Sequence, residues 1–354
     1  MQARIQNTYI ATSKSLAQLY RKRKRSLFYQ KVLWSITALY IIAMLIIFGL
    51  NYFANTPAFL KPFQVSPNNP YINVYLLSGL VLLLYPSSLG FAQAFKNFKI
   101  KENETMVNMV NNLFPEVEFS QGLIAPNKEI IKSKLFSWLK KESPMYSFGQ
   151  IRSHSRDLQI NIADIGIVEN NASNQLLGAL LQIPLLNMFV LLYQYVLKNM
   201  VSNSSVDNHT FTFRGMFCWL KFKKKLNGHT VVIPNNTCTK LNRLISYNFT
   251  EEQRIRLEDP RFAEQFLVYS TDQIEARYVL SASLMERIVT LKEKFNQPIL
   301  LSFQHQQLFL AVENEHGLFS FPSGKLDDLK IVEELTHDIQ TGLQIASELN
   351  LKAV

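Results

Sequence analysis

Three stretches of more than 20 residues contain no charged side chain, and they constrain the possible folds more than any other feature. They cover residues 32–53, 71–95 and 176–197. A helix of this length spans about 33 Å, which is enough to cross the hydrocarbon core of a bilayer. The apolar content of 47% agrees with an expectation that part of the chain contacts lipid.

The first two stretches predict a transmembrane helical hairpin over residues 32–95, with spans at 32–53 and 71–95. Pro86 lies in the second span, where a neighbouring helix can cover the carbonyl that it leaves free. A cleaved signal peptide is the alternative for the first span. It is disfavoured because the 31 residues before the span exceed such a leader and no small-residue cleavage site follows.

The charge distribution predicts an orientation for this hairpin. Residues 1–101 carry 12 Lys and Arg and no Asp or Glu, and the loop between the two spans holds Lys61 alone among them. Cations collect on the cytoplasmic side of membrane helices, so we expect both ends of the hairpin to face the cytoplasm. A basic run beside a span also contacts anionic headgroups, and the residues expected to do so are Arg21, Lys22, Arg23, Lys24 and Arg25.

A basic run can also bind nucleic acid, but the rest of the chain does not support such a partner. Residues 102–354 carry 25 Lys and Arg against 27 Asp and Glu. The part that would have to read nucleic acid is therefore nearly neutral. We expect a lipid bilayer and a membrane or cytoplasmic protein as partners, and no nucleic acid. A second copy of the chain is a further candidate partner.

Beyond about residue 145 the apolar pattern changes to the period of two that is typical of strands. In HTFTFRGMFCW, aromatic residues from Phe211 to Trp219 alternate with Thr210, Thr212, Arg214 and Met216, which predicts a half-buried strand. RDLQINIADIGIV predicts another strand, with a bulge near Asp164. Further short strands are expected in GHTVVIP, FLVYS, PILLSF, QLFLAVE and GLFSF, with PILLSF and QLFLAVE forming an antiparallel hairpin.

Amphipathic helices are predicted on both sides of these strands. Residues 96–144 form a helical connector that includes ETMVNMVNNLF and KEIIKSKLFSWLKK; the second is basic and either packs on the domain or lies on the membrane surface. Residues 326–354 form a C-terminal helix with apolar residues at spacings of three and four. Packing on the chain's own sheet and a coiled coil with a partner are its two interpretations.

Several blocks of the sequence resemble the bacterial family catalogued as domain of unknown function 3137. They are the FRG of Phe213 to Gly215, the NGHTVVIP around Gly228, DQIEARYVL and MERI, within a similarity over most of residues 30–325. The resemblance implies an N-terminal two-helix anchor followed by a cytoplasmic α+β domain, and no activity. We therefore expect a mixed, mainly antiparallel sheet domain at 145–325. We also expect a multi-pass protein of the bacterial cytoplasmic (inner) membrane with both termini in the cytoplasm, the N-terminal one formed by residues 1–31.

Acidic residues around DQIEAR suggest an acid–base site, and the weak catalytic candidates are Asp272, Glu275 and Arg277. Helix capping explains the same residues better. Asp272 followed by Glu275 matches a capping box, and Ser283 with Glu286 and Thr250 with Gln253 repeat the spacing. Arg277 then has carboxylates nearby for structural ion pairs.

The remaining polar residues do not form a recognised catalytic or metal-binding motif. The six histidines lack metal-ligand spacing, and no nucleophile elbow, phosphate-binding loop or dinucleotide fingerprint is present. Cys218 and Cys238 lack the spacing of a zinc or redox pair and predict two free thiols in a reducing compartment. We expect no metal and no cofactor.

One basic patch lies within the predicted sheet domain. It consists of Trp219, Lys221, Lys223, Lys224 and Lys225. These residues either contact anionic headgroups or protect the end of a strand from pairing with another chain.

The third uncharged stretch lies in residues 170–207, an insertion between two predicted strands that the family resemblance implies are near neighbours in one domain. A single crossing would put those strands on opposite sides of a bilayer, where they could not share a sheet. Pro184 and three polar side chains on one half of the helix also favour an interfacial or packed helix. A re-entrant segment or a third span remains the alternative.

Together these features predict a membrane-anchored interaction or scaffold protein rather than an enzyme. The membrane-contact residues are numerous, whereas a catalytic motif is missing. The alternative is a membrane-associated enzyme that acts on lipid or on a membrane protein through the carboxylates near Asp272.

Overall fold

The computed structural model describes residues 1–52, 72–121, 125–136, 145–155, 158–168, 211–221, 225–235, 253–295, 297–314, 317–322, 324–326 and 328–348. The chain divides into two compact units. One comprises Ala11–Met106, and the other comprises Met1–Ile10 with Val107–Val354. We refer to the first as the helix pair and to the second as the sheet unit.

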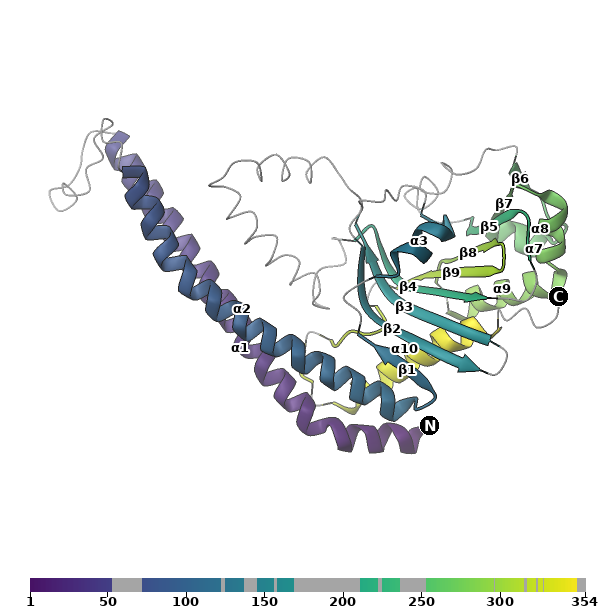
Figure 1. The fold of residues 1–354 in the computed structure, drawn as a ribbon, viewed down its shortest axis with the longest axis horizontal. Coiled ribbons are helices and arrows are strands. Elements are labelled where there is room, and N and C mark those ends of the chain that lie inside the picture. The colour runs from purple at the N-terminus through teal and green to yellow at the C-terminus, as the bar shows by residue number, and fades with distance from the viewer. Residues whose placement is uncertain are drawn as a thin grey trace. The chain divides into compact units, whose positions relative to one another are not determined.

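Two long helices run through the helix pair, α1 (Gln2–Tyr52) and α2 (Ile72–Leu113). Between residues 11 and 106 they lie side by side and antiparallel (Figure 1). The guanidinium of Arg23 lies 5.6 Å from the centre of the Phe98 ring. A methyl group on Gly90 would come within 3.3 Å of the Tyr29 ring, so the glycine allows α2 to approach this ring closely.

The predicted transmembrane hairpin is wrong, and so is the predicted multi-pass localisation in the cytoplasmic membrane. In the part of the chain that the structure describes, no helix has a stretch long and apolar enough to cross a bilayer. Residues 32–53 and 71–95 belong largely to α1 and α2, which extend well beyond them. Apolar side chains described at the end of the second stretch take part in packing, since the buried rings of Phe91 and Phe95 lie 5.7 Å apart.

The sheet unit contains a nine-stranded sheet in which every described neighbour pair is antiparallel. The strand order is β1-β2-β3-β4-β9-β8-β5-β7-β6 (Figure 1). The strands are β1 (Val117–Ser120), β2 (Met145–Ser155), β3 (Leu158–Ile167), β4 (Phe213–Lys221), β5 (His229–Pro234), β6 (Arg254–Ile255), β7 (Phe266–Ser270), β8 (Ile299–Gln304) and β9 (Gln307–Glu313). The α+β class is therefore confirmed.

Five described helices accompany the sheet: α3 (Asn127–Ser133), α7 (Pro260–Gln265), α8 (Gln273–Val279), α9 (Ala282–Phe295) and α10 (Leu329–Glu348). Helix α3 and the residues after it belong to the apolar cluster on one face of the sheet, which includes Ile165, Phe217 and Phe309. Helix α10 covers the opposite face, where a methyl group on Gly342 would meet the sulfur of Met216 at 2.9 Å.

Several predicted strands are confirmed in type and position. PILLSF and QLFLAVE form the hairpin of β8 and β9, and His305 in the turn has a φ of 53°. The register of β2 against β3 shifts between Ser147 and Gly149, opposite Ile165 and Asp164. The irregularity predicted near Asp164 is thus present, and the extra residue lies on β2.

Other expectations differ from the structure. Strand β4 is buried on both faces rather than half-buried, because α10 covers the side that holds Met216. GLFSF forms no strand; its backbone binds a buried carboxylate instead. Helix α3 ends at Ser133, since Lys134 adopts a left-handed conformation with φ 52°.

The C-terminal helix packs on the sheet of its own chain, as the first of its two interpretations predicts. Val332, Leu335 and Ile339 are buried, in agreement with their spacing of three and four. The insertion at 170–207, including the uncharged stretch 176–197, lies outside the described residues.

Candidate functional site

A buried ion pair joins the neighbouring strands β3 and β4. Asp164 is fully buried and Arg214 is 7% exposed. Arg214 Nη2 donates to Asp164 Oδ2 at 3.0 Å, Nη1 donates to Oδ1, and Nη1 also donates to the carbonyl of Ile165 at 3.1 Å. Both residues lie on the sheet face that α10 covers. A charge removed from water is tolerated only when it is paired and hydrogen-bonded, and this geometry meets both conditions.

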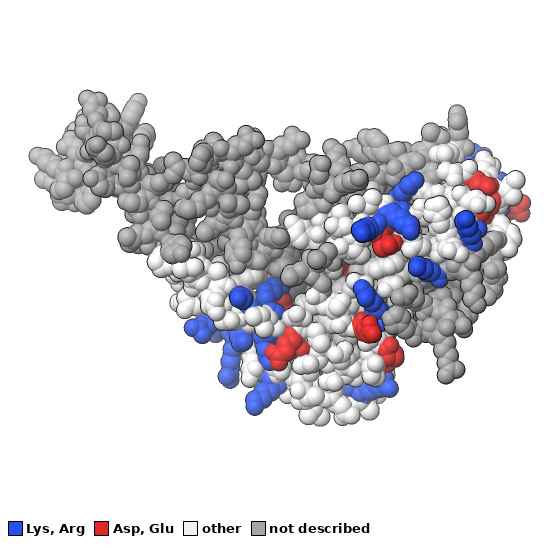
Figure 2. Space-filling model, in the orientation of Figure 1, with Lys and Arg blue, Asp and Glu red and all other residues white. Residues whose placement is uncertain are grey.

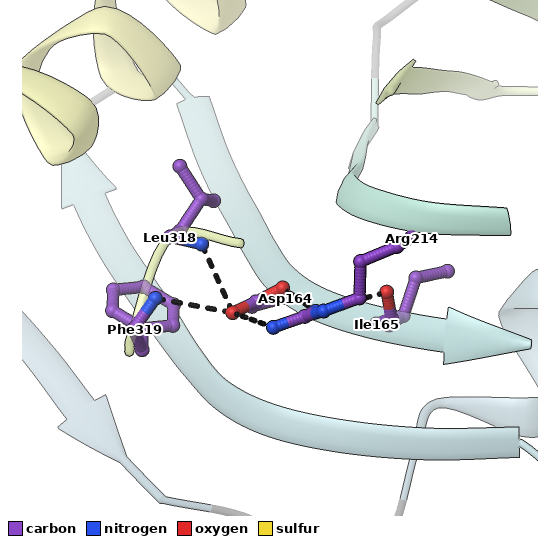
Figure 3. A network of polar contacts seen from close by, with 5 residues as sticks. All are labelled: Asp164, Ile165, Arg214, Leu318 and Phe319. Carbon is purple, nitrogen blue, oxygen red and sulfur yellow. Dashed lines mark hydrogen bonds and ion pairs between the residues drawn. The ribbon is translucent and has the colours of Figure 1, made fainter. Parts of the chain in front are cut away.

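The same carboxylate holds the backbone of a distant segment. Asp164 Oδ2 accepts hydrogen bonds from the amides of Leu318 at 3.0 Å and Phe319 at 3.1 Å (Figure 3). Its two oxygens therefore receive four donors, two from Arg214 and two from the backbone. A carboxylate engaged in this way acts as a structural anchor, and we call the unit of Asp164, Arg214, Leu318 and Phe319 the buried anchor.

Two glycines make the buried anchor possible. Gly317 has a φ of 72°, and a Cβ there would collide with the guanidinium of Arg214. Gly215 has a φ of 156°, and a Cβ there would collide with the carbonyl of Val312 on β9. The ring of Phe148 completes the site, with its centre 3.7 Å from the Arg214 guanidinium carbon. The FRG block is thus explained by an ion pair and by a close approach of two strands.

The segment that the buried anchor fixes forms one wall of a groove of about 720 Å³, and α10 forms the other wall. The lining residues are Gly317, Leu318, Ser320, Phe321, Pro322, Lys330, Ile331, Glu333, Glu334, Leu335, His337 and Asp338. Four of them are buried apolar residues, namely Leu318, Phe321, Ile331 and Leu335. They give the groove an apolar floor.

The rim of the groove carries more carboxylates than cations. Glu333, Glu334 and Asp338 contribute three carboxylates, against Lys330 and the imidazole of His337. Lys330 Nζ lies 3.7 Å from Glu334 Oε1, so the single lysine is already occupied by one of the acids. The groove therefore combines an apolar floor with a net negative rim.

The predicted catalytic candidates lie together, but their hydrogen bonds go to the backbone. Asp272 caps α8 by accepting from the amides of Ile274 and Glu275, both at 3.0 Å. The Glu275 carboxylate accepts from the amides of Asn227 at 3.0 Å and Gly228 at 2.5 Å. Glu275 thus anchors the turn before β5 instead of closing a capping box on Asp272.

Arg277 is exposed, and its Nη1 donates to the carbonyl of Gln273 at 3.3 Å within α8. The predicted cap at Ser283 is wrong: α9 begins at Ala282, and Ser281 Oγ accepts from the Leu284 amide at 3.4 Å. Thr250 lies outside the described residues. These contacts favour a structural role for the acidic residues around DQIEAR.

The predicted membrane-contact residues of the sheet domain differ in their exposure to solvent. Trp219 is half-buried beside Phe217, with ring centres 5.8 Å apart, so it belongs to the core margin. Lys221 and Lys225 are exposed. Lys223 and Lys224 lie outside the described residues.

The basic run of α1 is mostly exposed. Arg21, Lys22, Lys24 and Arg25 face solvent, whereas Arg23 is half-buried against Phe98. Burial lowers the pKa of Arg23, and the charge of Glu102 opposes that shift.

A buried polar pair on the other face of the sheet was not predicted. His229 Nε2 and Ser302 Oγ lie 3.0 Å apart and share a hydrogen bond. Burial lowers the pKa of His229 to about 4, and the charges of Lys134 and His305 add to this effect. Alternation within GHTVVIP places His229 on the same face as Val231, so the sequence does contain the signal for an inward-facing histidine.

The described residues contain no group of three His, Cys, Asp or Glu side chains that could hold a metal ion. Cys218 is buried with a free thiol whose pKa is raised to about 12 by burial, so it is unreactive at neutral pH. Cys238 lies outside the described part of the chain.

Comparisons with known proteins relate part of this chain to one family. No curated protein and no solved structure matches the chain. Residues 211–351 match the model of a family described as a protein of unknown function, DUF3137. The match includes β4 with Arg214, the segment 317–322 and α10, but not β3 with Asp164. It supports a domain of unknown function 3137 in this C-terminal part of the chain.

Proposed function

We propose that the sheet unit is a protein-interaction module, and that its groove holds an extended segment of a partner protein. The observation that carries this proposal is the construction of the groove wall. Asp164, which is buried in the sheet, fixes the amides of Leu318 and Phe319. A wall held in one conformation loses little entropy when a ligand binds.

The chemistry of the groove selects the kind of segment. Its floor is built from apolar side chains, and its rim carries three carboxylates against one lysine that lies near Glu334. A partner segment that places an apolar side chain on the floor and Lys or Arg at the rim complements both features. Such a module fits a scaffold or adaptor.

Selection from a library of displayed random peptides, with the full chain as target, tests this proposal. The enriched peptides should combine Leu, Ile or Phe with Lys or Arg, and they should lose most of their affinity for a Glu333→Lys variant. Glu286→Lys is the matched control, since Glu286 is exposed on α9 away from the groove. Peptides without a charge preference, or binding that Glu333→Lys leaves unchanged, would contradict the proposal.

An enzyme that acts on lipid or on a membrane protein is the alternative. The contacts of Asp272 and Glu275 favour it less, because both carboxylates already accept two backbone amides. A general base needs a lone pair that can reach a substrate proton. The contacts of Asp272 and Glu275 favour a structural role, in which they stabilise α8 and the turn before β5, over a role as a general base.

A further inference from the structure

The helix pair carries an excess of cations on its exposed side. Its described carboxylates, Glu102 and Glu104, lie within ion-pair distance of Lys99 at 2.5 Å and Lys101 at 3.2 Å. No carboxylate precedes Glu102 in the sequence. The exposed cations of α1 therefore have no acidic side chain on their own helix. Figure 2 shows blue side chains gathered over this part of the molecule.

These cations form a stripe with exposed apolar residues. At about 100° per residue, one sector about 120° wide on α1 contains Lys14, Arg21, Lys24, Arg25, Phe28, Lys31, Leu39 and Ile42, all exposed. The stripe is cationic at its N-terminal end and apolar beyond Lys31. Phe28 is 61% exposed and Leu39 is 67% exposed, so both expose apolar surface to water.

The opposite side of α1 faces inward. Ser26 is buried and Arg23 is half-buried, and the Arg23 guanidinium lies over the ring of Phe98 on α2. Packing of the helix pair therefore uses a different face from the stripe. The stripe is available to a partner without any rearrangement of α1 against α2 between residues 11 and 106.

We infer that this stripe binds the surface of a lipid bilayer that contains anionic headgroups. Phosphate groups would meet the cations, and the boundary of the acyl chains would accept Phe28, Leu39 and Ile42. Nucleic acid complements the cationic end alone and leaves the apolar end in water. The inference concerns contact with the membrane surface, and it is independent of the groove in the sheet unit.

Co-sedimentation of the full chain with vesicles tests the inference. The protein should bind vesicles of phosphatidylcholine mixed with phosphatidylglycerol, and bind those of phosphatidylcholine alone far more weakly. Each cation at an anionic surface contributes roughly fivefold to binding, so Arg21→Gln with Lys24→Gln and Arg25→Gln should lower the affinity about 100-fold. High salt should also lower the affinity for the anionic vesicles, because it screens the attraction between the cations and the headgroups.

Matched variants separate charge, position and apolar contact. Lys128→Gln with Arg256→Gln and Lys325→Gln removes three exposed cations of the sheet unit and should leave vesicle binding unchanged. Arg21→Lys with Arg25→Lys keeps the charge and should keep the binding, which would show that charge at these positions is sufficient. Phe28→Gln with Leu39→Gln should weaken binding to the anionic vesicles. Equal loss in both triple variants, equal binding to neutral vesicles, or binding to a DNA duplex in place of vesicles would overturn the inference.

Discussion

The two units of this chain use charge in opposite ways. In the sheet unit, Asp164 and Arg214 are buried, paired and hydrogen-bonded, and Asp164 fixes the course of the backbone at Leu318 and Phe319. In the helix pair, Arg21, Lys24 and Arg25 are exposed, and the sequence before Glu102 holds no carboxylate to balance them. Charge inside the sheet unit determines structure, whereas charge on the helix pair is available to an outside partner.

The sharpest way to break this comparison is to remove one member of the buried anchor. Asp164→Ala leaves the guanidinium of Arg214 and two backbone amides without their acceptor. We expect a loss of about 3–5 kcal/mol in the free energy of unfolding, measured by urea denaturation.

The exposed pair of Arg261 and Glu293 is the control for that experiment. Arg261 Nη2 lies 2.8 Å from Glu293 Oε2, but both side chains are largely exposed. Glu293→Ala should therefore change the stability little. Equal losses in the two variants would show that burial does not distinguish the pairs.

A pH experiment extends the comparison to the other face of the sheet. His229 has its pKa lowered to about 4, whereas a histidine in an unfolded chain titrates near 6.5. Between these values the unfolded chain binds a proton that the folded chain does not, so stability falls as the pH falls. We expect His229 to account for a loss on the order of 2 kcal/mol between pH 7 and pH 4.5.

The measurement is the free energy of unfolding at both pH values for the natural chain and for His229→Gln. The variant should lose less stability on acidification, because it has no proton to bind at this position. If the two proteins show the same pH dependence, His229 is not the group responsible.

Two glycines of neighbouring segments offer a smaller and more local test. Gly317→Ala introduces a Cβ at a φ of 72° and against the Arg214 guanidinium. We expect a loss of about 2 kcal/mol, measured by thermal unfolding. Gly324→Ala is the matched control, because a Cβ at that position would meet no neighbouring atom within 4 Å. A similar loss of stability in this control would show that the contact with Arg214 and the positive φ do not explain the effect at Gly317.

The smallest expected effect concerns the cap of α8. Asp272→Ala removes the acceptor for the amides of Ile274 and Glu275 and should cost about 1 kcal/mol. Ser283→Ala, within the first turn of α9 where a cap was predicted, should cost less. Loss of a cellular phenotype in a fully stable Asp272→Asn protein would instead favour the enzymatic alternative.

Local patterns were sufficient to predict much of the sheet. Alternation located β3 and β4, and the turn-length gap located the hairpin of β8 and β9. The spacing of Val332, Leu335 and Ile339 predicted the packed face of α10. Each of these signals lies within one element and depends on burial of its own side chains.

The buried anchor could not be predicted in the same way. Asp164 is 50 residues from Arg214 and 154 residues from Leu318, and no local period connects them. The apolar residues of GLFSF have the pattern of a strand, but the amides of Leu318 and Phe319 donate to the Asp164 carboxylate instead of to a neighbouring strand. The prediction of a transmembrane hairpin was wrong for a related reason. Hydropathy alone does not tell whether an apolar residue such as Phe91 packs against protein or faces lipid.

Hydrogen exchange at two amides tests the central claim most directly. If the buried anchor builds the groove wall, the amides of Leu318 and Phe319 should exchange slowly in the natural chain. Both should exchange much faster in Asp164→Asn under conditions where the strand amides of β8 remain protected. Rapid exchange of these two amides in the natural chain, or protection that survives the substitution, would contradict the account.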